Sequence, residues 1–268
     1  MTPSPTDPAS SPRQSFSQPN KSILAAVECL QWLATSERPV GSMEMAELMD
    51  VDRTRANRIL KSLAMAGMAE QTKGRKFVVG SGFHILAAQS LRASGILHAA
   101  APVLETRHAL DCIVALGVLW KRSVAYLYYH HPGQSTAQSL GAKFPHPVLR
   151  SSIGQMLLAQ LEPGEIERLF AGRDLAPYPS LEAMQAQLDE FRRQGHARID
   201  GKLYGISTSL GAPIRYHKRV VAAVAFSYLP EGADEGAYLE KLKETARQIE
   251  EQLAAEERAL FDLNQEPA

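Results

Sequence analysis

Apolar residues recur along the first part of the chain at the spacing of helix faces. In KSILAAVECLQWLA, which starts at Lys21, an apolar position returns every three or four residues. The motif SERP then predicts the end of this helix. A second helix is predicted over MEMAELM, with Ser42 as its N-cap, and a third runs from the capping residue Asp52 to about Ala66. Gly67 follows at the place where helices commonly end in a left-handed residue.

The third predicted helix has one apolar face and one cationic face. At 3.6 residues per turn its apolar residues fall within an arc of about 100°, and they are Ala56, Ile59, Leu60 and Leu63. The remaining surface carries Arg53, Thr54, Arg55, Asn57, Arg58, Lys61 and Ser62. One face is therefore expected to pack and the other to meet solvent or an anionic partner.

A basic hairpin is predicted directly after these helices. MAEQTKGRKFVVG predicts a strand, a turn at Lys73-Gly74-Arg75 and a second strand. Three helices followed by a hairpin, within residues 21–80, predict a winged helix-turn-helix.

The chemistry of these side chains suits double-stranded DNA. Arginine pairs bidentately with guanine, asparagine with adenine, and threonine bonds to bases or phosphates from the start of a recognition helix. Lys73, Arg75 and Lys76 at the hairpin would contact phosphates or the minor groove. Most cationic helix faces are only solvated, but the order of the elements favours a DNA-binding domain.

Residues 21–80 resemble the N-terminal domain of IclR-type bacterial transcriptional regulators. The pattern Arg53-Thr54-x-x-x-Arg58-x-Leu60-x-x-Leu63 and the closing FVVG carry this resemblance. The sequence departs from the pattern at Asp52, where the family often has proline, and at Arg55 and Asn57. Because the last two positions would read bases, the operator sequence does not follow from relatives.

Residues 81–110 predict two linker helices with a break at Ser94-Gly95. They are too apolar for an isolated linker, with Leu86, Leu91, Ile96, Leu97, Val103 and Leu104. We interpret them as the first part of a dimer contact. Packing onto the C-terminal domain of the same chain is the alternative.

Residues 111–268 predict a sheet covered by helices. Strands are expected in CIVALGVLW, SVAYLYYHH, STAQSLG, SLGAPIRYH and RVVAAVAFSYL, and helices in SSIGQMLLAQL, PGEIERLFAG and LEAMQAQLDEFRRQG. A long helix is expected from about Asp234 to Leu260. This order predicts an α/β (α+β) domain. It resembles the GAF-like effector-binding domain of the IclR group, so the resemblance covers about residues 21–255.

The resemblance implies a pocket for a small organic acid. It places a carboxylate-binding segment at Ser151-Ser152-Ile153-Gly154, where a helix N-terminus and two hydroxyls would favour an anion. It also places Asp200, Ser209 and Ser227 around the same cavity, with Ser209 where a cysteine is frequent. Arg150, just before the segment, would either pair with the carboxylate or point to solvent.

Composition limits the remaining choices. The formal net charge is +0, so a nucleic-acid surface must be a local patch. Two cysteines, Cys29 and Cys112, fit a reducing compartment. Residues 1–20 lack an apolar signal-peptide core and predict a disordered tail, and no apolar run is long enough to span a bilayer. We therefore expect a cytoplasmic protein.

Metal and enzyme functions find little support in the sequence. His130 and His131 are adjacent on a predicted strand and would point to opposite faces. The phosphate-binding, dinucleotide-binding, hydrolase and zinc-protease motifs do not occur.

The prediction is a homo-oligomeric transcription factor, without catalytic residues, metal or cofactor, that reads a pseudo-palindromic operator and responds to an organic acid. The alternatives are a winged helix that docks proteins and a winged helix fused to an enzyme domain.

Overall fold

The computed structural model describes residues 19–140, 146–203 and 206–263, and the chain divides into two compact units, Met1–Ala87 and Ala88–Ala268. The tail predicted over residues 1–20 lies outside the described residues except for its last two. Residues 141–145 and 204–205 also lie outside the described residues.

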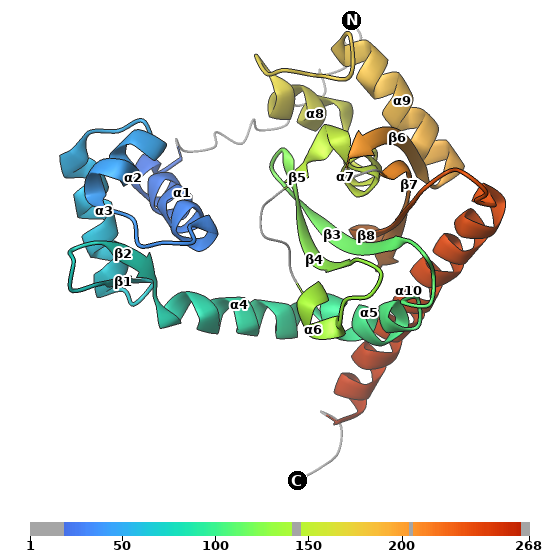
Figure 1. Cartoon of the computed structure of the whole chain (residues 1–268), viewed down its shortest axis with the longest axis horizontal. Coiled ribbons are helices and arrows are strands. Elements are labelled where there is room, and N and C mark those ends of the chain that lie inside the picture. The colour runs from blue at the N-terminus through green and yellow to red at the C-terminus, as the bar shows by residue number, and fades with distance from the viewer. Residues whose placement is uncertain (1–18, 141–145, 204–205, 264–268) are drawn as a thin grey trace, which may run out of the picture. The chain divides into compact units, whose positions relative to one another are not determined.

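The first unit consists of three helices and a two-stranded hairpin (Figure 1). In chain order these are α1 (Lys21–Thr35), α2 (Ser42–Leu48), α3 (Arg53–Met65), β1 (Ala69–Gln71) and β2 (Phe77–Val79). The two strands are antiparallel, with Ala69 opposite Val79. This is the winged helix-turn-helix that the sequence predicts.

Capping residues set the limits of the helices in this unit. The Asp52 side chain accepts from the backbone N–H of Arg55 at 2.8 Å and begins α3, as predicted. Gly67 after α3 has a φ of 71°, also as predicted. For α2 the prediction is wrong by one residue, because Gly41 is the N-cap and Ser42 is the first helical residue.

A small apolar core holds the first unit together. It is built from all three helices and both strands, and includes Cys29, Leu33, Met45, Leu60 and Phe77. Burial raises the pKa of the Cys29 thiol to about 12. Cys29 therefore packs as a small apolar side chain.

Two helices follow the hairpin, α4 (Ser81–Ser94) and α5 (Ile96–Glu105). They are separated at Gly95, whose φ of 64° interrupts the helix at the predicted break. In α5, Ile96, Val103 and Leu104 are buried in the core of their own second unit. The expectation that these three residues contact a partner chain is therefore wrong, and exposed large hydrophobic residues remain only in α4 among the described parts of the two helices.

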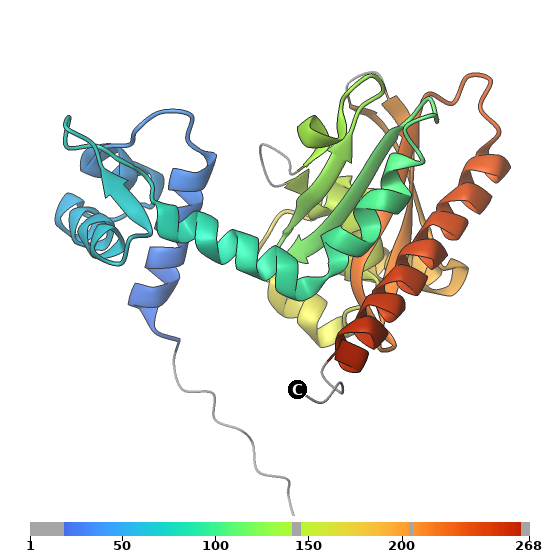
Figure 2. The ribbon, with the colours of Figure 1, turned by 90° about the horizontal axis from the view of Figure 1, so that it is seen from below.

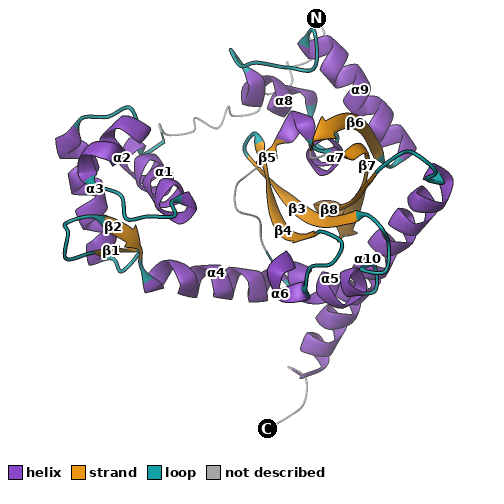
Figure 3. Cartoon of the chain, viewed as in Figure 1, coloured by secondary structure: helices purple, strands orange, loops and turns teal. Residues whose placement is uncertain are grey.

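The second unit is built on a six-stranded sheet of order β5-β4-β3-β8-β7-β6, in which all described neighbours are antiparallel (Figure 3). The strands are β3 (Ile113–Trp120), β4 (Ser123–His130), β5 (His146–Pro147), β6 (Ala197–Leu203), β7 (Ile206–Tyr216) and β8 (Arg219–Tyr228). The other elements are α6 (Thr136–Ser139), a 3₁₀ turn η1 (Val148–Arg150), α7 (Ser152–Leu158), α8 (Pro163–Phe170), α9 (Leu181–Gln194) and α10 (Glu235–Leu263).

Helices cover both faces of this sheet. Figure 2 shows α5 and α10 along one face, and their side chains share a core with Leu210, Phe226 and alternate neighbours in the strands. The opposite face carries α7, α8 and α9 over Ala223 and Ala225. Successive residues of a strand therefore pack alternately into the core beneath α5 and α10 and the core beneath α7, α8 and α9.

Two local predictions are wrong. Thr136–Ser139 forms a short helix instead of a strand, because Ser135 and Gln138 cap each other's backbone in a capping box. The edge strand β6 was not predicted, since Arg198 and Asp200 give it the polarity of a loop.

None of the helices in the described part of the chain combines the length and the apolar character that crossing a bilayer requires.

Candidate functional site

The polar face of α3 is open to solvent. Its exposed residues are Arg53, Thr54, Arg58, Lys61 and Ser62, with Arg55 and Asn57 half-buried. The other face packs into the core through residues such as Ala56 and Leu60, both fully buried. Within the described part of the chain, the four cations of α3 have no ion-pair partner. They are available to an external anion.

The hairpin turn presents a second group of cations. Its backbone closes between Thr72 and Lys76, where the Thr72 N–H donates to the Lys76 carbonyl at 2.8 Å and the Arg75 N–H donates to the Thr72 carbonyl at 3.0 Å. Arg75 adopts a left-handed φ of 58°, which is strained for a residue with a side chain. Lys73, Arg75 and Lys76 are all exposed. The turn is thus ordered by its own backbone and displays three cations.

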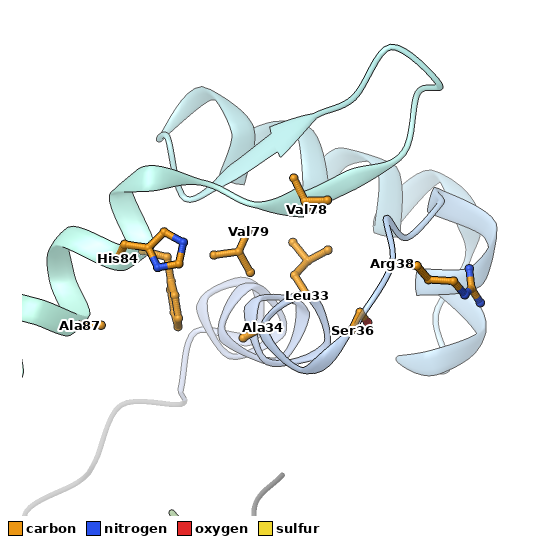
Figure 4. A pocket seen from close by; sticks show the side chains of 9 residues that line it. Leu33, Ala34, Ser36, Arg38, Val78, Val79, His84 and Ala87 are labelled. Atoms are coloured by element: carbon orange, nitrogen blue, oxygen red, sulfur yellow. The ribbon is translucent and has the colours of Figure 1, made fainter. Parts of the chain in front are cut away.

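The first unit also contains a cavity of about 380 Å³ between the end of α1, β2 and the start of α4 (Figure 4). Leu33, Val79 and Phe83 give it an apolar lining, and His84 and Arg38 lie at opposite ends. The Arg38 guanidinium pairs bidentately with Glu44 at 2.5 and 3.1 Å. This cation is neutralised within the unit, in contrast to those of α3.

In the second unit, three serine hydroxyls meet between α7 and the sheet. We call Ser152, Ser209 and Ser227 the serine cluster. The Ser152 and Ser209 hydroxyls are hydrogen-bonded at 2.7 Å, and the Ser227 hydroxyl donates to Ser209 at 2.8 Å. Ser152 is buried, whereas Ser209 and Ser227 are half-buried. The structure thus brings together three of the predicted effector contacts.

The sheet register and a glycine create this cluster. Ser209 and Ser227 are direct partners on β7 and β8, so both side chains point to the α7 face. Two residues further along β7, Gly211 allows the first turn of α7 to approach closely, because a Cβ there would lie 2.7 Å from the Ser152 carbonyl carbon. The sheet and the helix therefore contribute hydroxyls to one point.

The rest of the predicted segment is used for capping and packing. The Ser151 hydroxyl accepts from the Gly154 N–H at 3.2 Å as the N-cap of α7. Ile153 is buried, and a Cβ on Gly154 would lie 2.3 Å from the Val148 carbonyl oxygen. Arg150 is exposed, and its carbonyl accepts from His146 Nε2 at 3.3 Å.

Asp200 does not join the serine cluster, which corrects its expected position. Asp200 is opposite Thr208 in the β6–β7 pairing, one residue out of phase with Ser209, so it points to the α10 face. There it accepts from Thr208 at 3.1 Å and pairs with Arg198, which also binds Glu235 of α10. Asp200 is therefore part of an ion-pair network on the surface of the second unit.

Two tyrosines beside the cluster were missed by the sequence analysis. A bulge at Leu127 places both Tyr126 and Tyr129 on the α7 side of β4, with ring centroids 4.9 Å apart. The Tyr126 hydroxyl is hydrogen-bonded to Ser151 at 3.2 Å. Burial raises the pKa of Tyr126, and the Ser151 bond partly opposes this. The aromatic run YLYYHH was the available signal.

Comparison with protein families decides the identity of the second unit. The family described as "Bacterial transcriptional regulator IclR C-terminal" matches residues 88–251, starting where the second unit starts. The chain belongs to the IclR family of bacterial transcriptional regulators. None of the curated proteins matches it by sequence.

Solved IclR-type structures share the fold over most of this IclR-family chain. An IclR homologue from Microbacterium hydrocarbonoxydans, complexed with 4-hydroxybenzoate, is 23% identical with a TM-score of 0.68, covering 87% of this chain and 99% of its own. An IclR-family regulator from Brucella abortus is 19% identical with a TM-score of 0.69, covering 87% and 92%. The Agobacterium tumefaciens repressor BlcR is 25% identical with a TM-score of 0.51, covering 87% and 96%.

Proposed function

We propose that this IclR-family regulator binds a pseudo-palindromic DNA operator through α3 and the hairpin, and that a small organic acid bound in its second unit changes that affinity. The observation that carries the DNA-binding part is the unpaired cationic face of α3. Asp52 fixes the start of the helix, so its first turn projects Arg53, Thr54 and Arg55 as a recognition helix would into a major groove.

The hairpin supports DNA affinity that does not depend on sequence. Lys73, Arg75 and Lys76 would neutralise phosphates beside the groove that α3 enters. Arg55 and Asn57 are the side chains expected to select bases, and Arg53, Arg58 and Lys61 complete the interface.

The proposed oligomer is a homodimer or a pair of dimers. Two recognition helices would then meet half-sites about one helical turn apart. Exposed apolar residues on the first unit and on α4 support a self-contact, and they are Ile23, Leu24, Val27, Ile85, Leu86 and Leu91. The regulator would work in the cytoplasm, where its DNA is.

The serine cluster supports the proposed effector site, with Arg150 and Ser151 beside it in the chain. Hydroxyls donate to carboxylate oxygens, and an exposed guanidinium can pair with the same group. Tyr126 and Tyr129 add aromatic rings, and a relative of the same fold is complexed with 4-hydroxybenzoate. We therefore propose an aromatic acid as the first class to test. No cofactor, metal or catalytic step is part of this proposal.

Fluorescence anisotropy on the upstream intergenic DNA, with a random duplex for comparison, tests the DNA-binding part. Wild type should prefer the upstream DNA, and Arg58→Glu should abolish this binding. Arg173→Glu, a charge reversal of an exposed cation in the second unit, should leave it unchanged.

Added benzoate, 4-hydroxybenzoate and aliphatic acids should shift the wild-type affinity for at least one ligand. If folded wild type binds neither duplex at low salt, with or without these acids, a protein-docking winged helix or an added enzyme activity becomes the better account.

A further inference from the structure

Two histidines from separate segments stack face to face inside the second unit. His108 lies in the turn after α5, and His130 is the last residue of β4. Their ring centroids are 3.6 Å apart and their planes differ by 2°. His130 is 1% exposed and His108 is half-buried. The two rings thus join the end of a helix to the end of a strand.

The hydrogen bonds of this pair fix the tautomer of His130. The Ser139 hydroxyl donates its only proton to the Ser135 carbonyl at 3.0 Å. It therefore accepts from His130 Nδ1, which lies 3.0 Å away. The neutral ring then carries its lone pair on Nε2, which is buried and has no hydrogen-bond partner in the described part of the chain.

A second proton on His130 would be poorly tolerated. It would place a buried N–H donor without an acceptor and a positive charge 3.6 Å from the ring of His108. The pKa of His130 is lowered by burial first, and then by the nearby His108 and His131.

The described elements around the pair supply few groups that could stabilise a positive charge on His130. From the α5 side the titratable groups are His108 and Glu105, and Glu105 is exposed and acts on Tyr128. From the β4 side the titratable groups are Tyr128 and His131, and the Tyr128 hydroxyl is hydrogen-bonded to His108 Nε2. The short helix α6 contains no titratable side chain.

We infer that the His108–His130 pair is an acid-sensitive latch that holds α6 against the end of β4 and the turn after α5. When His130 is neutral, Ser139 is bound and α6 is docked. When His130 takes a second proton, the buried positive charge beside the His108 ring and the missing acceptor favour the undocked state.

The direction of the pH dependence follows from proton binding. A histidine whose folded pKa is below its unfolded value binds fewer protons when folded, so the stability it contributes decreases on acidification. The docked state is fully favoured above about pH 6.5, the ordinary pKa of histidine, and is lost progressively below it. The inference does not depend on the identity of the effector.

Hydrogen–deuterium exchange of the full chain at pH 7.5 and 5.5, corrected for intrinsic rates, tests the latch. Protection of residues 132–140 should decrease several-fold at pH 5.5 in wild type, towards the limit of about tenfold that the titration of one histidine allows. In His130→Asn, whose side-chain amide still donates to Ser139 but does not titrate, protection should differ less than twofold between the two values. His217→Asn, an exposed position with a left-handed φ of 47° that asparagine tolerates, should behave like wild type.

An NMR titration of histidine-labelled wild type gives a test that needs no variant at His130. The His130 ring should titrate below the ordinary range. In His108→Phe, which keeps a stacked ring but removes the electrostatic effect of His108 on His130, the pKa of His130 should rise. Unchanged protection of residues 132–140 at pH 5.5 in wild type, or a pH response that persists in His130→Asn, would overturn the latch.

Discussion

Gly211 of β7 lies directly under the start of α7, so that a Cβ atom there would stand 2.7 Å from the carbonyl carbon of Ser152 and 2.8 Å from its oxygen. The contact is with backbone, which cannot rotate away. We expect Gly211→Ala to push α7 off the sheet and to reduce the free energy of unfolding by about 1–3 kcal/mol. Urea denaturation of the full chain measures this.

Gly201 of β6 provides the matched control. A Cβ there meets nothing within 4 Å among the described residues, so Gly201→Ala should change the free energy of unfolding by less than about 0.5 kcal/mol. Equal stability of Gly211→Ala and wild type would show that α7 can move without cost.

Ser209 is the central hydroxyl of the serine cluster, and Ser209→Ala removes both of its hydrogen bonds. It leaves the buried Ser152 hydroxyl without this partner, a change that costs about 1–3 kcal/mol. If the proposed effector site is correct, calorimetric affinity for the active acid should also fall about tenfold, a loss of ~1.4 kcal/mol.

Thr208→Val controls for a general loss of stability. Thr208 is the next residue of β7, and its hydroxyl donates to Asp200 on the other face of the sheet. Acid affinity should therefore be unchanged in this variant. An equal loss of affinity in both variants would place the effect in the stability of β7 and not in ligand contact.

Sequence periodicity predicted the first unit because its signals are local. The apolar arc of α3, the Asp52 cap and Gly67 lie within one element and need no information about distant residues. The same reasoning failed for α6, because a four-residue helix contains barely one period and only the Ser135–Gln138 capping box distinguishes it from a strand.

The candidate effector site was only partly predictable because it depends on register. Asp200 and Ser209 differ by one step of pairing, and that step sends their side chains to opposite faces. The position of Tyr129 depends on a bulge at Leu127, and the stacking of His108 on His130 joins residues far apart in the chain. None of these relationships leaves a periodic pattern in the sequence.

Arg75 combines backbone strain with a predicted DNA contact, so its removal should have two opposite effects. Arg75→Gly relieves the left-handed φ of 58° and should stabilise the first unit by about 1 kcal/mol. It should also weaken DNA binding, because a phosphate contact is lost. Thermal unfolding and anisotropy measure the two effects separately.

Lys218→Gly is the corresponding control in the second unit, where Lys218 has a φ of 63°. This variant should gain stability without a change in DNA affinity. Unchanged DNA binding by Arg75→Gly would remove the hairpin tip from the proposed interface.

Lys76 should contribute to the salt dependence of binding. A phosphate contact releases about one counterion, so Lys76→Ala should reduce the slope of log K against log salt by about 1. Because a phosphate contact is the same at every base pair, the variant should lose equal affinity for the operator and for a random duplex. Lys218→Ala should keep the wild-type slope. A loss confined to the operator would instead assign Lys76 to base recognition.

Cys29 and Cys112 should be unreactive in the folded protein. Burial, helped by Glu28 and Asp111, raises the pKa of each thiol to about 12. A raised thiol pKa favours the neutral form, so at pH 8 only about one molecule in 10⁴ carries the reactive thiolate. Iodoacetamide should label neither cysteine at pH 8 unless urea unfolds the chain.

An introduced cysteine gives the reference rate for this labelling. Ala186 is exposed on α9, so Ala186→Cys should react at the rate of an ordinary thiol while the two native cysteines remain unlabelled. Each native cysteine reports on a different unit, since Cys29 lies in the core of the first and Cys112 in the core of the second. Selective labelling of Cys29 in folded protein would therefore show that the first unit opens independently.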